Sequence, residues 1–281
     1  MDESLMGTPA PIRRRPPSRG MYVLPSLFTA GNVALGFYSL TQAVQGMLGR
    51  NECFDRAALA IGVAVACDGL DGLVARATGT TSDFGKELDS LADVITFGVA
   101  PAMLAYVWGF RNLWPANPAE DEGKLVVLGV VVCFLFLICG ACRLARFNIS
   151  VNPQPRNPGR PGKKFFVGMP IPAGAGVIAS VVQFQSGSPI HDARLAILWM
   201  LLIAGTGFLM VSSWRFWSGK EITSGGRMPF QVVVLLALGL AVTLLFHRWA
   251  LILIALGYLV SGVIARVAYS WQRRRRLGAT G

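Results

Sequence analysis

Charged residues are scarce in this sequence. Only 15% of its 281 residues are Asp, Glu, Lys or Arg, whereas 53% are hydrophobic. A typical soluble domain carries about 25% charged residues and does not contain many long uncharged runs. The scarcity of charge therefore excludes an ordinary soluble domain and favours a protein embedded in a membrane.

Cysteine and histidine are also rare, with five and two residues respectively. The five cysteines do not suggest a disulfide framework. Cys139 and Cys142 form a C-x-x-C inside an apolar run, where we expect small residues for helix packing rather than a redox motif. His191 and His247 stand far in sequence from the acidic stretch described below, so a metal site with histidine ligands is not expected there.

Long apolar runs are what the sequence has in abundance. A membrane-spanning helix needs about 20 predominantly apolar residues. Eight runs meet this requirement, near residues 22–47, 57–77, 88–110, 125–147, 165–186, 194–213, 228–246 and 249–271. The sequence therefore predicts an all-α polytopic membrane protein with about eight transmembrane helices.

The formal net charge of +11 raises the possibility of a nucleic-acid partner, which the placement of the charges argues against. If the N-terminus is cytoplasmic, 20 of the 26 Lys and Arg residues lie on the cytoplasmic side or at the inner ends of the predicted spans. This bias follows the positive-inside rule, and basic residues there meet anionic lipid. We therefore expect cytoplasmic N- and C-termini and no nucleic-acid binding.

One acidic stretch lies between two of these apolar runs. It reads D-x-x-D-G-x-x-A-R, then eight residues, then G-x-x-x-D-x-x-x-D, and its carboxylates are Asp68, Asp71, Asp89 and Asp93. An acidic side chain at the centre of a membrane helix costs about 2.5 kcal/mol or more. Residues three or four apart share one helical face, and a short loop makes the two helices antiparallel neighbours. The four carboxylates should therefore converge near the inner membrane surface.

Four converging carboxylates repel one another unless something neutralises them. Hard divalent cations accept all-oxygen ligands, so the spacing predicts Mg²⁺ or Mn²⁺, with room for two ions of the kind used in phosphoryl transfer. The guanidinium of Arg76 adds paired N–H donors for phosphate oxygens. The alternative is that the carboxylates simply pair with Arg76, Lys86 or Arg143.

The complete pattern resembles the signature of the CDP-alcohol phosphatidyltransferase family, membrane enzymes that join an alcohol to the phosphatidyl group of CDP-diacylglycerol. Eight positions carry the resemblance: Asp68, Asp71, Gly72, Ala75, Arg76, Gly85, Asp89 and Asp93. The resemblance implies that the four Asp hold two divalent ions and that Asp93 is also the general base. It implies binding of CDP-diacylglycerol near Asn32, Gly72, Ala75, Arg76, Ser82 and Gly85, and a homodimer.

The resemblance also divides the chain into parts. Residues 1–20 are predicted to be a disordered cytoplasmic tail, because they are rich in Pro and Arg without apolar periodicity. Residues 21–213 would form the catalytic core of six helices. A loop and a two-helix extension over 214–271 and a basic cytoplasmic tail over 272–281 follow.

Further stretches are similar to the bacterial membrane-bound family members that use serine: LPSLFTAGNVALGF, RLARFN at 143–148, GMPIPA at 168–173 and VSSWRFWSGK at 211–220. One departure is Ser26, where Asn is expected after the proline. The resemblance implies L-serine as the acceptor and the bacterial inner membrane as the location, with the active site on the cytoplasmic side. Arg143, Arg146 and Arg215 are the candidates for binding the serine carboxylate.

Other acceptors and functions stay open from the residues alone. Glycerol 3-phosphate or inositol phosphate would require the same cationic side chains, so charge does not identify the acceptor. A Mg²⁺-dependent intramembrane prenyltransferase usually places its two acidic motifs on distant helices. A divalent-cation transporter would bring its cargo past Arg76, which repels it. Both are therefore the less favoured interpretations.

Overall fold

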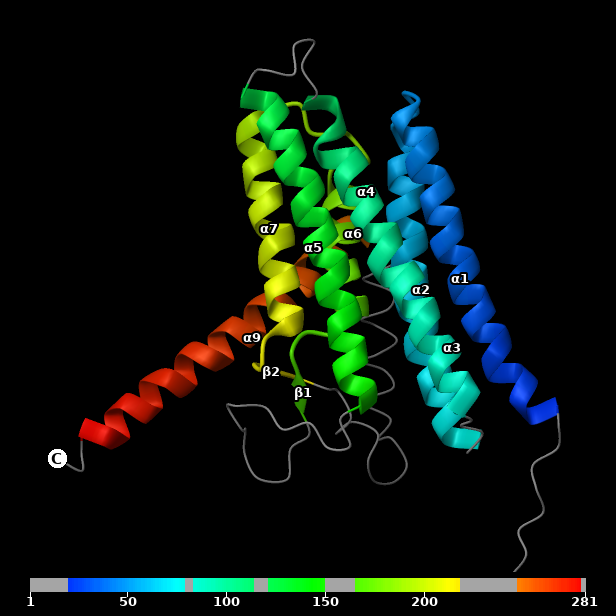
Figure 1. The fold of residues 1–281 in the computed structure, drawn as a ribbon, viewed down its shortest axis with the longest axis vertical. Coiled ribbons are helices and arrows are strands. Elements are labelled where there is room, and N and C mark those ends of the chain that lie inside the picture. The colour runs from blue at the N-terminus through cyan, green and yellow to red at the C-terminus, as the bar shows by residue number, and fades with distance from the viewer. Residues whose placement is uncertain (1–19, 79–82, 114–120, 150–164, 218–246, 279–281) are drawn as a thin grey trace, which may run out of the picture.

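The structure is a computed structural model, and it describes residues 20–78, 83–113, 121–149, 165–217 and 247–278. Long helices dominate these residues (Figure 1). In chain order the elements are α1 (Gly20–Met47), α2 (Glu52–Thr78), α3 (Asp83–Asp93), the π-helix η1 (Val94–Val99), α4 (Ala100–Gly109), the short 3₁₀ helix η2 (Arg111–Leu113), α5 (Asp121–Ile149), β1 (Phe165–Val167), α6 (Ile171–Phe184), α7 (Ala193–Val211), β2 (Arg215–Trp217) and α9 (His247–Gly278).

Helices α1 and α2 lie side by side along most of their lengths, and α5 lies along α7 (Figure 1). Small residues allow the close approach of α1 and α2. A Cβ atom on Gly46 would collide with the ring of Phe54, and Ala43, Ala57 and Ala58 are fully buried. Because apolar side chains gain little from leaving lipid, close packing of small residues is what holds such helices together.

The third apolar run forms one continuous helical segment that changes geometry immediately after Asp93. Here α3 gives way to the π-helix η1, and α4 then continues the segment. Pro101, in the first turn of α4, has no N–H and cannot make the usual bond to the carbonyl four residues earlier. A short π-helical segment is one way for a helix to accommodate such an interruption, and such segments are frequent at functional sites.

The expectation of a membrane span over residues 165–186 is wrong in its extent. Residues 165–167 are a β-strand that pairs antiparallel with β2, with Phe166 opposite Phe216, and the helix α6 has only 14 residues. Pro170 is extended, with ψ of 144°, and Pro172 lies in the first turn of the helix. Pro170 disfavours the helical conformation for Met169, whereas Pro172 is tolerated in the first helical turn, so the helix begins only at Ile171.

Four described segments are long and apolar enough to cross a membrane: Phe84–Leu113, Gly123–Ile149, Ala193–Val211 and Arg248–Trp271. Their outward faces carry exposed apolar side chains such as Leu128, Leu198 and Leu253. The chain is therefore an α-helical membrane protein. The apolar run at 228–246 lies outside the described residues, so the number of eight helices stays a prediction.

Candidate active site

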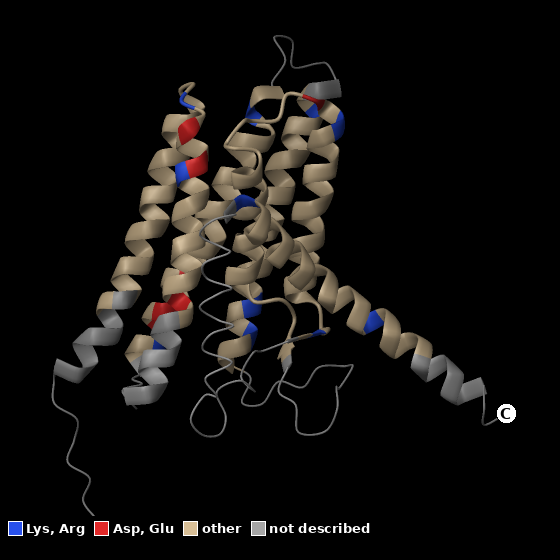
Figure 2. Ribbon diagram, turned by 180° about the vertical axis from the view of Figure 1, so that it is seen from behind, with Lys and Arg blue, Asp and Glu red and all other residues tan. Residues whose placement is uncertain are grey.

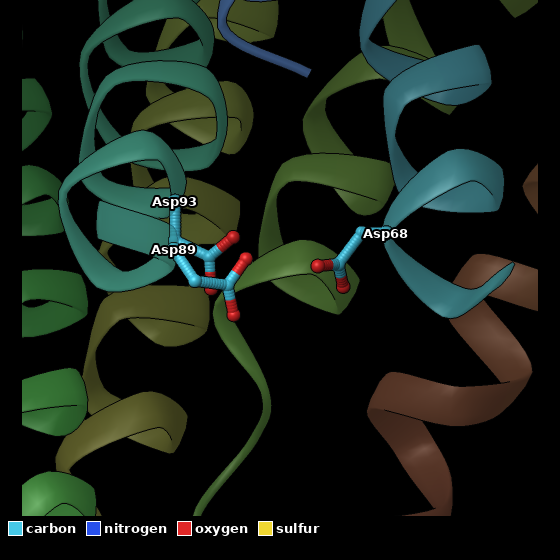
Figure 3. A group of neighbouring side chains, drawn as sticks. All are labelled: Asp68, Asp89 and Asp93. Atoms are coloured by element: carbon cyan, nitrogen blue, oxygen red, sulfur yellow. The ribbon is translucent and has the colours of Figure 1, made fainter. Parts of the chain in front are cut away.

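Three of the four predicted metal ligands converge in the structure. Asp68 on α2 faces Asp89 and Asp93, which lie one helical turn apart on α3 (Figure 3). One carboxylate oxygen from each residue lies within 4.8 Å of the others. Asp71 lies on α2 one turn beyond Asp68, but its side chain is outside the described part of the structure. The predicted convergence across two helices is thus present for the three described side chains.

Asp93 is the most buried of the three, with 8% of its surface exposed. Its Oδ1 atom is buried and has no hydrogen-bond partner among the described residues. A buried carboxylate without compensating contacts is costly, and two further carboxylates beside it raise the cost. A divalent cation accepts this set of oxygen donors and removes the repulsion, so the residues present fit such an ion.

The cationic side chain of Arg143 is buried close to this cluster. Arg143 comes from α5, is 8% exposed, and interacts electrostatically with Asp93. Its guanidinium carbon lies 5.8 Å from the centre of the Phe147 ring, a cation–π distance. Its Nε atom is buried and finds no acceptor within the described part of the chain. Figure 2 shows acidic residues of α2 and α3 and basic residues of α5 near one end of the bundle, and further charged residues of α2 and α5 near the other end.

Arg146 has a clear structural role. Its Nη1 donates to the carbonyl of Val211 at 2.9 Å, and its Nη2 donates to the carbonyls of Val167 and Ser212, each at 3.3 Å. These bonds join α5 to the end of α7 and to β1. Arg215 is half-buried on β2, opposite Val167. The expected roles of Arg146 and Arg215 in binding the acceptor stay predictions.

Helix α1 is attached to the π-turn that follows Asp93. Asn32 is 3% exposed, and its backbone carbonyl accepts a hydrogen bond of 3.0 Å from the hydroxyl of Thr96 in η1. The side-chain Oδ1 of Asn32 is buried without a hydrogen-bond partner among the residues that the structure describes. The structure therefore brings Asn32 into contact with the turn that follows Asp93, and leaves one of its polar atoms unsatisfied.

The remaining predicted substrate-binding residues are only partly described. Gly85 lies in the first turn of α3 and is half-buried. Gly72, Ala75 and Arg76 lie on α2, and Ser26 lies on α1, but the surroundings of these residues are outside the described part of the structure. Ser82 lies outside the described residues altogether. The assignment of these positions to CDP-diacylglycerol stays a prediction.

The structure adds residues near the site that the motif does not contain. Asn148, at the end of α5, donates to the Ser90 hydroxyl at 2.9 Å, and Ser90 donates to the Lys86 carbonyl at 3.0 Å. Tyr258, on α9, interacts electrostatically with Arg143. A phenol in the middle of an apolar run is the signal that could have identified Tyr258 from the sequence.

Comparison with known proteins identifies the family of this chain. The CDP-alcohol phosphatidyltransferase family model matches residues 22–206. A protein of Helicobacter pylori strain 26695 named CDP-diacylglycerol–serine O-phosphatidyltransferase is 36% identical over 222 residues, which cover 79% of this chain and 83% of the relative.

Proteins with the same name from two other organisms are also similar. The protein from Methanocaldococcus jannaschii is 39% identical over 137 residues, covering 49% of this chain and 55% of the relative. The protein from Saccharomyces cerevisiae is 35% identical over 158 residues, covering 56% and 52% respectively. The family model covers most of the chain, and the clustered carboxylates lie within the matched residues. This chain therefore belongs to the CDP-alcohol phosphatidyltransferase family.

Proposed function

We propose that this protein transfers the phosphatidyl group of CDP-diacylglycerol to the hydroxyl of L-serine, giving phosphatidylserine and CMP. The observation that carries the proposal is the cluster of Asp68, Asp89 and Asp93 beside the buried Arg143. This arrangement offers oxygen ligands for a cation that binds diphosphate and a guanidinium for a carboxylate-bearing acceptor. The name shared by the relatives supports serine as that acceptor.

The acidic cluster would hold Mg²⁺ or Mn²⁺, and we propose two ions with Asp68, Asp71, Asp89 and Asp93 as ligands. When bound, the ions neutralise charge on the diphosphate of the substrate. The family is generally dependent on divalent cations, which supports this assignment. Arg76, on the same helix as Asp68, would place a guanidinium near the diphosphate oxygens.

Asp93 would act as the general base. It would accept the proton of the serine hydroxyl as the serine oxygen forms a bond to the phosphorus that carries the diacylglycerol. The bond from this phosphorus to the bridging oxygen breaks, and CMP leaves with that oxygen. The burial of Asp93 and the unpartnered Oδ1 support this role, because a base must be able to accept a proton from the substrate.

Arg143 is the best-supported candidate for binding the serine carboxylate. It is buried next to the acidic cluster and has an unpartnered Nε among its described surroundings, whereas Arg146 already donates to three backbone carbonyls. Asn32, Gly72, Ala75, Ser82 and Gly85 would contact the nucleotide and diphosphate. Glycine at positions 72 and 85 leaves room for the substrate near the helix backbones.

We further propose that the protein lies in the bacterial cytoplasmic membrane with its site at the cytoplasmic side. The excess of basic residues at the predicted inner span ends supports this orientation. The diacylglycerol would then enter from the inner leaflet, since the lipid carries its own membrane anchor. A homodimer is also proposed, from the resemblance to the family.

The acceptor can be tested directly with purified protein in lipid nanodiscs. CDP-diacylglycerol would be incubated with Mg²⁺ or Mn²⁺ and with labelled serine, glycerol 3-phosphate or inositol phosphate in separate reactions. We expect CMP release and a labelled phospholipid with serine alone. Turnover only with a phosphorylated alcohol would refute serine and keep the family chemistry. Turnover with none of the three would refute the proposed reaction as a whole.

A further inference from the structure

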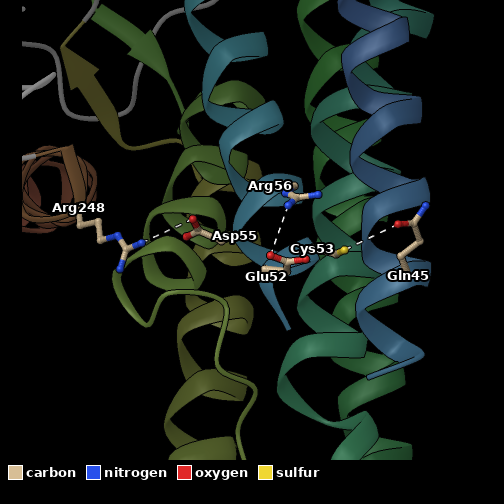
Figure 4. Close-up of polar contacts among 6 residues, drawn as sticks. All are labelled: Gln45, Glu52, Cys53, Asp55, Arg56 and Arg248. Atoms are coloured by element: carbon tan, nitrogen blue, oxygen red, sulfur yellow. Dashed lines mark hydrogen bonds and ion pairs between the residues drawn. The ribbon is translucent and has the colours of Figure 1, made fainter. Parts of the chain in front are cut away.

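The last helix, α9, reaches the site although it lies beyond the residues that the family model matches. Its first turn is attached to the bundle far from the acidic cluster, near the start of α2. Arg248 forms an ion pair of 3.6 Å with Asp55 on α2 (Figure 4). It also donates a hydrogen bond to Ser186, which follows α6. This attachment fixes where α9 starts on the bundle.

A second attachment fixes α9 beside the β-hairpin. The ring of Phe216 on β2 is 1% exposed, and its centre lies 5.6 Å from that of Tyr258. Gly262 lies one turn further along α9, and a Cβ atom there would collide with the Phe216 ring. The missing side chain at Gly262 therefore lets the helix approach β2 closely enough for the Tyr258 ring to pack on Phe216.

This packing places Tyr258 near Arg143, the buried basic residue of the site. Tyr258 is half-buried and interacts electrostatically with Arg143. The hairpin on which Tyr258 packs is joined to the same part of α5, because Arg146 donates to the Val167 carbonyl. Arg143 also interacts electrostatically with Asp93, and its guanidinium carbon lies over the Phe147 ring. Arg143 thus interacts with Asp93 of α3, Phe147 of α5 and Tyr258 of α9.

We propose that Tyr258 is a positioning residue that orients Arg143 toward the carboxylate of the acceptor, so that α9 completes the acceptor site. A guanidinium binds a carboxylate well only when its N–H groups have the right direction. A phenol oxygen can accept an N–H of Arg143, which limits the rotation of its side chain and leaves other N–H groups for the acceptor. The proposal rests on the proposed function, because it assumes an acceptor that carries a carboxylate.

The first test compares the Michaelis constants of Tyr258→Phe and the unchanged protein. Phenylalanine keeps the ring on Phe216 and removes only the hydroxyl. We expect the KM for serine to rise about tenfold, the scale of losing one contact to a charged group, with kcat and the KM for CDP-diacylglycerol nearly unchanged. Tyr269→Phe is the matched control, since Tyr269 lies on the same helix about three turns further along, and it should behave as the unchanged protein.

A double-mutant cycle tests whether Tyr258 acts through Arg143. We expect Arg143→Lys to raise the KM for serine by itself, and Tyr258→Phe to add little in that background. If the two substitutions raise the KM for serine by factors that multiply in the double variant, the hydroxyl acts independently of Arg143. That result would overturn the proposal.

The outcomes separate this inference from the proposed reaction. If the unchanged protein releases no CMP with serine, both proposals fail. If it is active and Tyr258→Phe has the same KM for serine, only the role of Tyr258 fails. If Tyr258→Phe lowers the melting temperature and raises the KM for both substrates equally, the residue is merely structural and the inference is again overturned.

Discussion

Asp68 and Asp93 bring carboxylate oxygens to within 4.8 Å of each other from two different helices. Asp93 is also the last residue of α3, directly before the π-turn. The acidic cluster and the change in helix geometry therefore meet at one residue. Thr96 in η1 donates to the Asn32 carbonyl, so α1 is joined to the segment that follows Asp93, and Asp68 of α2 lies close to the same point.

Replacing Asp93 with Asn removes the proposed base and one proposed ligand while keeping the size of the side chain. We expect CMP release to fall by about 10²-fold to 10⁴-fold, the usual contribution of a general base. The control is Glu87→Gln on the same helix, because Glu87 is exposed and has no role in the proposed site. Near-normal turnover by Asp93→Asn at saturating substrate would contradict the assignment of the base.

Removing divalent cations with a chelator should stop turnover, and Mg²⁺ or Mn²⁺ should restore it. Asp89→Asn should raise the concentration of Mn²⁺ required, because the cluster loses one charged ligand. Binding of Mn²⁺ followed by electron paramagnetic resonance gives a readout that is independent of activity. Equal Mn²⁺ binding by the Asp89→Asn variant and the unchanged protein would argue against this residue as a ligand.

Arg146 and Arg143 should respond differently to conservative replacement. Arg146→Lys removes a guanidinium that donates to three carbonyls, two of them half-buried, so we expect a lower melting temperature and a loss of about 1–3 kcal/mol in stability. Arg143→Lys should instead raise the KM for serine with a smaller thermal effect. The reverse pattern would make Arg146 the residue that binds the acceptor.

Gly36 should be intolerant of a side chain because α1 passes close to the π-turn. A Cβ atom there would lie 2.9 Å from the Thr96 Cα and 2.7 Å from its Oγ1, so Gly36→Ala should separate α1 from η1. Such overpacking costs about 1–3 kcal/mol, and we expect lower thermal stability together with lower activity.

Gly31→Ala is the matched control on the same helix, since no described atom outside the adjoining helix backbone lies within 4 Å of a Cβ at that position. Its melting temperature should match that of the unchanged protein or exceed it slightly, because Ala favours helix over Gly. If Gly36→Ala melts like Gly31→Ala, the contact between α1 and the π-turn does not contribute to stability.

Hydrophobic run length was enough to predict the four described segments that can cross a membrane, and helical spacing predicted the facing of Asp68 toward Asp89 and Asp93. These features depend on local periodicity, which the sequence carries directly. The extent of the span at 165–186 was predicted wrongly, although Pro170 and Pro172 indicated a break. The apolar content of this stretch masked the pairing of Phe166 with Phe216, because a contact between distant strands leaves no periodic signal.

By itself, the sequence determined the class of protein, the acidic cluster and the resemblance to a family, since each depends on residue type and spacing along the chain. Only the tertiary structure decided that Arg146 binds the carbonyls of Val211, Val167 and Ser212, and that Tyr258 packs on Phe216 beside Arg143. The reason is that these contacts join helices far apart in the sequence. Their geometry follows from how the helices and the hairpin pack, and two arginines three residues apart receive different surroundings.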